Sequence, residues 1–206
     1  MREDFDPTPL PLEYYQQSDV LFLSRDLLGK YLFTCIDGAI AGGIIVETEA
    51  YCGIEDRASH AFANRHTKRN ASMFCQGGVA YVYQCYGIHC LFNIVTNLAD
   101  IPHAVLIRAL QPMCGLEIML QRRSKRQLAR NVAGGPGLLT QALGISLQHN
   151  GLQLTGPTVW VEDRGVRICE SRIISSARVG VDYAGEDAQK PWRFRIRDCP
   201  WTSPAK

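Results

Sequence analysis

The chain has 206 residues, of which 46% are hydrophobic and 20% charged, with a formal net charge of +2. This composition is typical of a globular domain, and no apolar run reaches the ~20 residues that a membrane-spanning helix requires. Residues 1–60 contain 4 basic and 11 acidic residues, whereas residues 61–206 contain 18 basic and 9 acidic ones. A basic face is the usual footprint of a polyanionic partner, although charge alone does not separate it from a solvated surface.

The first elements are a tail and a helix. The opening MREDFDPTPLPLEYY is acidic, rich in proline and without the apolar core of a signal peptide. We expect residues 1–17 to form a loosely ordered tail. A helix should follow, capped by Ser18, with apolar side chains at positions 20, 21, 23, 27 and 28 and Gly29 after its end.

Two strands joined by a tight turn come next. KYLFTCI and AIAGGIIVETEAY flank Asp37-Gly38, a dipeptide typical of β-hairpin turns. At the end of the second strand Glu47, Glu49 and Tyr51 are spaced two residues apart, so they should share one face. Like charges side by side on a strand are unfavourable, and this pair therefore indicates a site that uses carboxylates.

Residues 52–78 are polar and should be irregular. Their segment NRHTKRN suits contacts with phosphates, and the candidate residues are Arg65, Thr67, Lys68 and Arg69. VAYVYQC and IHCLFNIVT then flank Tyr86-Gly87 and predict a second hairpin with an aromatic ring at its tip. Such a ring either folds back onto the domain or acts as a wedge between stacked bases.

The rest of the chain predicts a strand at HAVLIRAL, a helix from about Gly115, a short helix after GGPG, and strands at TVWVED, VRICESRIISSARVGV and WRFRIRDCPW. GGPG lacks the lysine and the spacing of a nucleotide triphosphate loop. The eight cysteines include no C-x-x-C pair, so we predict free thiols and no metal site. We expect one α+β domain over residues 1–206, with a strongly bent mixed or antiparallel sheet, flanking helices and a protruding β-hairpin.

A glutamate at a strand end among aromatic rings suits hydrolysis, because a base can orient water while flat walls hold a planar substrate. His60 is a candidate second wall, or else a residue of a helix surface or cap.

Together these motifs resemble the alkyladenine DNA glycosylases, the 3-methyladenine or methylpurine type. The matching stretches include IVETEAYCGIEDRASHAF, TKRNASMF, AYVYQCYGIHCLFNIVT, AVLIRALQP, GGPGLLTQALGI and ARVGVDYAGEDAQKPWRFRIRDCPW. They follow the family's order and cover most of residues 18–202. The resemblance implies an enzyme that needs no cofactor. It would flip alkylated or deaminated purines out of duplex DNA and hydrolyse the N-glycosidic bond, leaving an abasic site.

The resemblance also implies roles for single residues. Glu49 aligns with the general base that activates water, and Arg108 with an arginine that positions this water. The implied walls of the base pocket are Tyr51, His60 and Tyr83, with Asn93 crowding out the 2-amino group of normal guanine. The implied intercalating residues are Tyr86 and its neighbour Ile88. Glu47 should be structural, paired with a basic group or a backbone N–H.

Three departures from the family bear on affinity and lesion range. Leu138 stands where relatives commonly carry Lys, Ile88 where the mammalian enzymes have Met, and Lys68 where Pro is usual. The expected partner is double-stranded DNA with damaged purines. We expect the protein to bind it as a monomer and to have no membrane partner. With no export signal, we expect a cytoplasmic location at the bacterial nucleoid, or a nuclear one in a eukaryote. The alternatives are a nucleic-acid binding module without catalysis and a hydrolase of free nucleosides.

Overall fold

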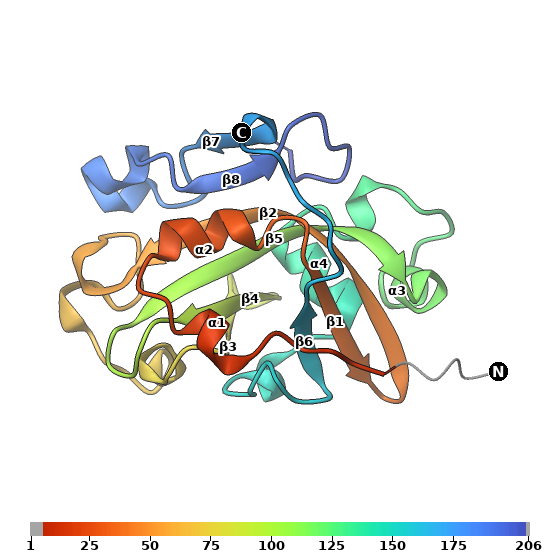
Figure 1. Ribbon diagram of the computed structural model, residues 1–206, viewed down its shortest axis with the longest axis horizontal. Helices are drawn as coiled ribbons and strands as arrows, with labels where there is room; N and C mark the ends of the chain where they lie inside the picture. Colours follow the sequence, from red (N-terminus) through yellow and green to blue (C-terminus); the bar gives the residue numbers. More distant parts are fainter. Residues whose placement is uncertain (1–5, 205–206) are drawn as a thin grey trace.

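The computed structural model describes residues 6–204 (Figure 1), and one antiparallel sheet organises them. Its strands follow the order β3-β4-β5-β2-β1-β6, while β8 pairs with β2 and β7 with β8. The strands are β1 (Tyr31–Ile36), β2 (Ala39–Cys52), β3 (Ala80–Cys85), β4 (His89–Thr96), β5 (His103–Cys114), β6 (Val159–Glu162), β7 (Ile173–Ser176) and β8 (Arg193–Ile196). The predicted α+β domain with a bent antiparallel sheet is confirmed.

The helices are short. They are α1 (Leu12–Tyr15), α2 (Val20–Asp26), α3 (Leu116–Arg122) and α4 (Pro136–Leu143). The 3-10 segments are Gly53–Glu55, Phe62–Asn64, Ala71–Phe74, Arg130–Val132, Leu147–His149, Glu170–Arg172 and Asp182–Gln189. Within residues 6–204, no helix has the length and apolar character that crossing a membrane takes.

Strand β2 bends because its two halves have different partners. β5 runs along one edge of β2, while the other edge pairs first with β1 and then, at residues 47–49, with β8. The register with β5 shifts at Gly42/Gly43 and again on both sides of Glu47. A Cβ on Gly43 would lie 2.1 Å from the Gln111 carbonyl oxygen, so only glycine allows the two backbones to approach this closely.

The N-terminal residues depart from two expectations. Asp19, not Ser18, caps α2, because its side chain accepts hydrogen bonds from the N–H groups of Leu21 and Phe22. Tyr15 is fully buried and the N–H of Leu10 bonds to the Val161 carbonyl. The expected loose tail is therefore wrong for residues 6–17, which pack on the domain, while residues 1–5 lie outside the described part.

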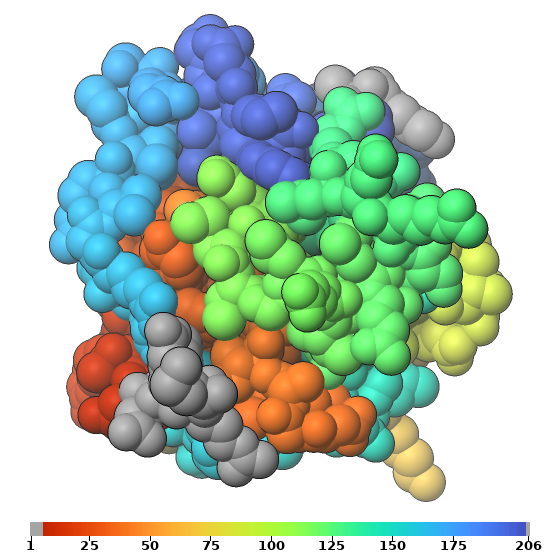
Figure 2. All heavy atoms as spheres, turned by 90° about the vertical axis from the view of Figure 1, so that its right-hand side faces the viewer, coloured from red at the N-terminus to blue at the C-terminus, as the bar shows by residue number. Residues whose placement is uncertain are grey.

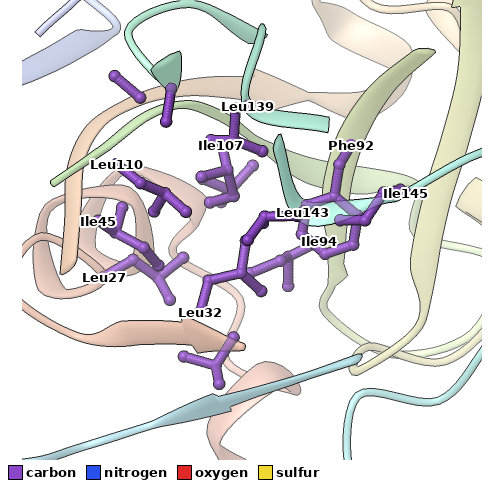
Figure 3. Close-up of a cluster of buried hydrophobic side chains, with 14 of the residues drawn as sticks. Leu27, Leu32, Ile45, Phe92, Ile94, Ile107, Leu110, Leu139, Leu143 and Ile145 are labelled. Atoms are coloured by element: carbon purple, nitrogen blue, oxygen red, sulfur yellow. The ribbon is translucent and has the colours of Figure 1, made fainter. Parts of the chain in front are cut away.

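The main core joins helices to both halves of the sheet. Figure 3 shows Leu27 from the C-terminal cap of α2, Ile45 from β2, Ile107 from β5 and Leu139 from α4 pointing toward one another, and all four are fully buried. Burying each such side chain contributes roughly 1.5–3 kcal/mol. The core therefore supports the paired segments of β2 and β5 that carry the predicted catalytic residues Glu49 and Arg108.

The late segments of the chain belong to the same domain. Figure 2 shows them, in blue, packed against segments from the middle of the chain, in green, on one face of the molecule. Strand β8 pairs with residues 47–49 of β2, which brings residues 193–203 close to the end of β2.

Candidate active site

Three charged side chains meet inside the protein where β2 and β5 pair. Glu47 and Glu49 are fully buried, and Arg108 is 6% exposed. Arg108 Nε lies 2.8 Å from Glu47 Oε1, and its Nη1 lies 3.2 Å from Glu49 Oε1. One guanidinium thus bridges the two carboxylates, which explains how the strand tolerates them side by side.

Glu47 is bound on both oxygens. Its Oε1 also accepts hydrogen bonds from Arg193 Nε at 2.8 Å and the Ser203 hydroxyl at 2.7 Å, while Oε2 accepts one from the Ser203 N–H at 2.6 Å. Burial alone would raise the pKa of Glu47, but Arg108 and Arg193 outweigh it and the pKa is lowered. The predicted pairing of Glu47 with basic and backbone groups is confirmed, and Glu47 holds the C-terminal segment to the sheet.

Glu49 is held by three different donors. Its Oε1 accepts a hydrogen bond from the Val179 N–H at 2.8 Å besides the contact with Arg108, and its Oε2 accepts one from the Tyr51 hydroxyl at 2.8 Å. Burial, with the neighbouring charge of Glu49, raises the pKa of Tyr51 well above its ordinary value. The Tyr51 hydroxyl therefore stays protonated at neutral pH and donates to the carboxylate.

A cavity of about 750 Å³ opens beside these groups. The predicted pocket residues all line it: Tyr51, His60, Tyr83 and Asn93. Arg108 lines it as well, and so do residues 135–138 at the start of α4. Glu49 is not part of the wall, but its three partners Tyr51, Arg108 and Val179 are. The carboxylate thus lies one layer behind a hollow whose size suits a small planar ligand.

His60 belongs to an aromatic cluster. Its ring centroid lies 4.6 Å from that of Tyr83, and its Nδ1 is 2.7 Å from the Tyr81 hydroxyl. Burial lowers the pKa of His60 to about 4, with further contributions from Arg69 and Arg65, so the imidazole is neutral at pH 7. Of the two readings of His60, the structure favours a cavity wall.

The hairpin tip exposes its apolar side chains. Tyr86 is 88% exposed and Ile88 is 74% exposed. Tyr86 and Gly87 have φ angles of 51° and 72°, as a tight two-residue hairpin turn requires. The Tyr86 ring therefore does not fold back onto the domain, and it lies on the rim of the cavity.

The four predicted phosphate-binding residues are all exposed, but the side chains of two of them also form hydrogen bonds within the protein. The Thr67 hydroxyl donates a hydrogen bond to Asn70 Oδ1, and Arg69 Nη2 donates one to the Gln84 carbonyl. Arg65 and Lys68 form no ion pair with any residue in the range 6–204. The loop is thus ordered while presenting its positive charge.

Several residues of the site were not predicted from the sequence. Buried Asn70 donates hydrogen bonds to the carbonyls of His60 and Arg65 and fixes the basic loop to the cavity wall. Arg178 lies 4.9 Å from the centroid of the Tyr51 ring and pairs with buried Asp56. Only Tyr81 had a usable signal, because it shares a strand face with Tyr83. Across residues 6–204, no cluster of His, Cys, Asp and Glu side chains suits a metal ion.

Comparison with known proteins agrees with this geometry. The family described as "Methylpurine-DNA glycosylase (MPG)" matches residues 13–200. A protein of Chlamydia felis is 45% identical, over 91% of this chain and 95% of its own length. A Chlamydia pneumoniae protein is 46% identical over 89% of this chain and 92% of its own length. A Bacillus licheniformis protein is 44% identical over 92% of this chain and 93% of its own length. Each is named "Putative 3-methyladenine DNA glycosylase".

The protein has a curved sheet, a buried glutamate–arginine pair, a ring-lined cavity and an exposed aromatic tip. Together with these matches, the features define a DNA glycosylase, an enzyme that hydrolyses N-glycosidic bonds. Its substrate is therefore DNA. The chain belongs to the methylpurine-DNA glycosylase family, as the sequence motifs predicted.

Proposed function

We propose that the protein excises alkylated and deaminated purines from duplex DNA, using a water molecule that Glu49 activates. The proposed substrate bases are 3-methyladenine, 7-methylguanine, hypoxanthine and ethenoadenine. One observation carries the proposal: the buried Glu49 carboxylate contacts Tyr51, Arg108 and Val179, and all three line the cavity. The names of the relatives support 3-methyladenine as one of the bases.

Base flipping is the first step of the proposed reaction. Removing a base from the stack costs a few kcal/mol, and the cost is lowest for damaged or mismatched bases. Stacking of the base on an aromatic ring returns about 1–3 kcal/mol, and the cavity offers Tyr51, His60 and Tyr83. The exposed Tyr86 ring would fill the gap that the base leaves in the duplex. A hydrolase of free nucleosides would have no use for such an exposed ring.

Cleavage then replaces one bond with another. Glu49 takes a proton from water, the water oxygen bonds to C1′ of the sugar, and the electron pair of the C1′–N bond goes to the purine. The carboxylate also stabilises the positive charge that develops on the sugar. A cationic alkylated purine leaves as a neutral base, so it needs no acid. A neutral purine such as hypoxanthine leaves as an anion, which takes up a proton from solvent.

The product is an abasic site in an intact strand. Among residues 6–204, no lysine lines the cavity, so its wall offers no amine to attack C1′ in place of water. Asn93 would select against normal guanine. Its side chain is buried and its amide donates a 3.1 Å hydrogen bond to the Tyr81 carbonyl, so it keeps its place in the wall when a base enters.

The isosteric substitution Glu49→Gln tests the proposal. We expect base release from a lesion-containing duplex to fall by about 10²- to 10⁴-fold, the usual contribution of a general base, while lesion binding persists. A panel of duplexes with one lesion each, scored for free base and abasic sites, provides the measurement. Glu117→Gln is the matched control, because Glu117 is exposed on α3. Unimpaired turnover by Glu49→Gln would refute the assignment.

A further inference from the structure

A second, smaller cavity of about 440 Å³ adjoins the first. The two cavities share five lining residues, Ser59, His60, Arg69, Tyr81 and Tyr183, and three of these carry aromatic rings: His60, Tyr81 and Tyr183. The hydrogen bond between His60 and Tyr81 fixes two of these rings. Tyr183 is 70% exposed, yet its hydroxyl donates a 3.1 Å hydrogen bond to the Ala58 carbonyl, which fixes the third. A base in the first cavity is thus one layer of rings away from the second.

The second cavity concentrates positive charge. Arg57, Arg65 and Arg69 line it together with Thr67, and no acidic residue of the range 6–204 does. Arg57 and Arg65 form no ion pair with any residue that the structure describes. Asp187 accepts a hydrogen bond from the Arg57 backbone N–H, but its carboxylate pairs with Lys190.

This chemistry suits a phosphate. Guanidinium groups bind phosphate oxygens through paired, charge-assisted hydrogen bonds, and a hydroxyl can add a further donor. His60 contributes no charge at neutral pH, because burial and the nearby Arg69 and Arg65 lower its pKa to about 4. The positive charge that attracts an anion therefore comes from the three arginines.

We propose that this second cavity binds one backbone phosphate of the damaged strand, next to the flipped nucleotide, and that Arg57 is one of its ligands. The inference rests on the proposed function, since a nucleotide whose base enters the first cavity carries its phosphates close by. The rings of His60, Tyr81 and Tyr183 lie between this phosphate and the base, while Arg69 lines both cavities. Arg57 was not among the phosphate contacts predicted from the sequence.

The test measures binding of the full chain to a duplex with one ethenoadenine, in the Glu49→Gln background. We expect Arg57→Gln to weaken binding about ten-fold, and to reduce the slope of log K against log salt by about 1. The side chain of Arg57 is exposed, so its replacement leaves the fold intact. Arg167→Gln is the control. Arg167 is exposed, pairs with Asp163 and follows β6 at the other end of the sheet from the hairpin, so its replacement should change neither quantity.

A second measurement locates the phosphate. Phosphates beside the lesion are replaced one at a time with uncharged methylphosphonates. At one position the methylphosphonate should weaken DNA binding by the protein that retains Arg57. The same replacement should not weaken DNA binding by the Arg57→Gln variant any further. The assignment is overturned if Arg57→Gln and Arg167→Gln have the same affinity and salt dependence. It is also overturned if every methylphosphonate lowers the affinity of the protein with Arg57 and of the Arg57→Gln variant by the same factor.

Inorganic phosphate, titrated at constant ionic strength, separates a free anion from DNA. One outcome is that inorganic phosphate displaces the duplex only when Arg57 is present, while no methylphosphonate position depends on Arg57. That result would assign the cavity to a free anion and overturn the proposal. Failure of the proposed function has a different signature. Protein with Glu49 intact would then release no base from any duplex, whatever the effect of Arg57→Gln on binding.

Discussion

The hydroxyl of Tyr51 donates a 2.8 Å hydrogen bond to Oε2 of Glu49. The ring that is predicted to stack on the flipped base therefore also fixes the carboxylate that is predicted to activate water. Arg178 lies behind the same ring and is held by Asp56. Base recognition and water activation are thus coupled through one side chain, and two substitutions at this position can separate them.

Tyr51→Phe removes the hydroxyl but keeps the ring. We expect lesion binding to persist and single-turnover base release to slow about ten-fold or more, since a hydrogen bond to a charged group contributes about 1.5–3 kcal/mol. Tyr51→Leu removes the ring as well and should also weaken lesion binding, because stacking contributes about 1–3 kcal/mol per base. Equal single-turnover rates for Tyr51→Phe and the unmodified protein would contradict the role of this hydrogen bond.

Local patterns in the sequence predicted much of the framework. The turns at Asp37-Gly38 and Tyr86-Gly87 were recognised from their residue types, and all four residues have positive φ angles. Two-residue spacing placed Glu47, Glu49 and Tyr51 on one face, and their contacts agree. Such features depend on neighbours in the chain, which is why a single sequence reveals them.

Contacts between distant segments could not be predicted in the same way. The Arg108–Glu49 contact depends on the register of β5 against β2, and two shifts beside Glu47 set that register. The bond from the Val179 N–H to Glu49 spans 130 residues and involves a backbone group, so no side-chain pattern signals it. For Arg108, only resemblance to a family supplied the role, and the structure supplied its partners.

Glu47→Ala should destabilise the protein by about 3–5 kcal/mol, because it leaves the buried Arg108 and Arg193 without their common partner. Urea unfolding at neutral pH measures the free energy of unfolding. Glu170→Ala is the control, since Glu170 pairs with Arg25 at the exposed surface and such a pair contributes at most about 1 kcal/mol. Equal losses for the two variants would show that Glu47 does not stabilise the fold as its contacts indicate.

Protonation of His60 should lower the free energy of unfolding when the pH falls. Burial lowers the pKa of His60 from 6.5 to about 4 in the folded protein. Between these values the unfolded chain binds more protons than the native one, so the free energy of unfolding falls as the pH falls. The contribution of His60 to this loss is at most about 3 kcal/mol.

His60→Gln isolates that contribution. The carboxylates titrate in both proteins, so the difference between the two unfolding curves reports on His60 alone. The gap in unfolding free energy between the two proteins should narrow as the pH falls from about 6.5 to about 4, because only the unmodified protein pays the cost of protonating His60. A gap that stays constant over this range would contradict the lowered pKa.

Tyr86→Ala tests the wedge. Because the ring is 88% exposed, its loss should change the free energy of unfolding by no more than about 0.5 kcal/mol. Base release from a duplex should slow about ten-fold or more, since the unstacking energy of a few kcal/mol is no longer offset, whereas release from a single strand should not change. Tyr86→Phe keeps the ring and should act like the unmodified protein, and Phe22→Ala removes an exposed ring from α2 as a control. An equal loss on single and double strands would mean that Tyr86 serves the cavity and not the duplex.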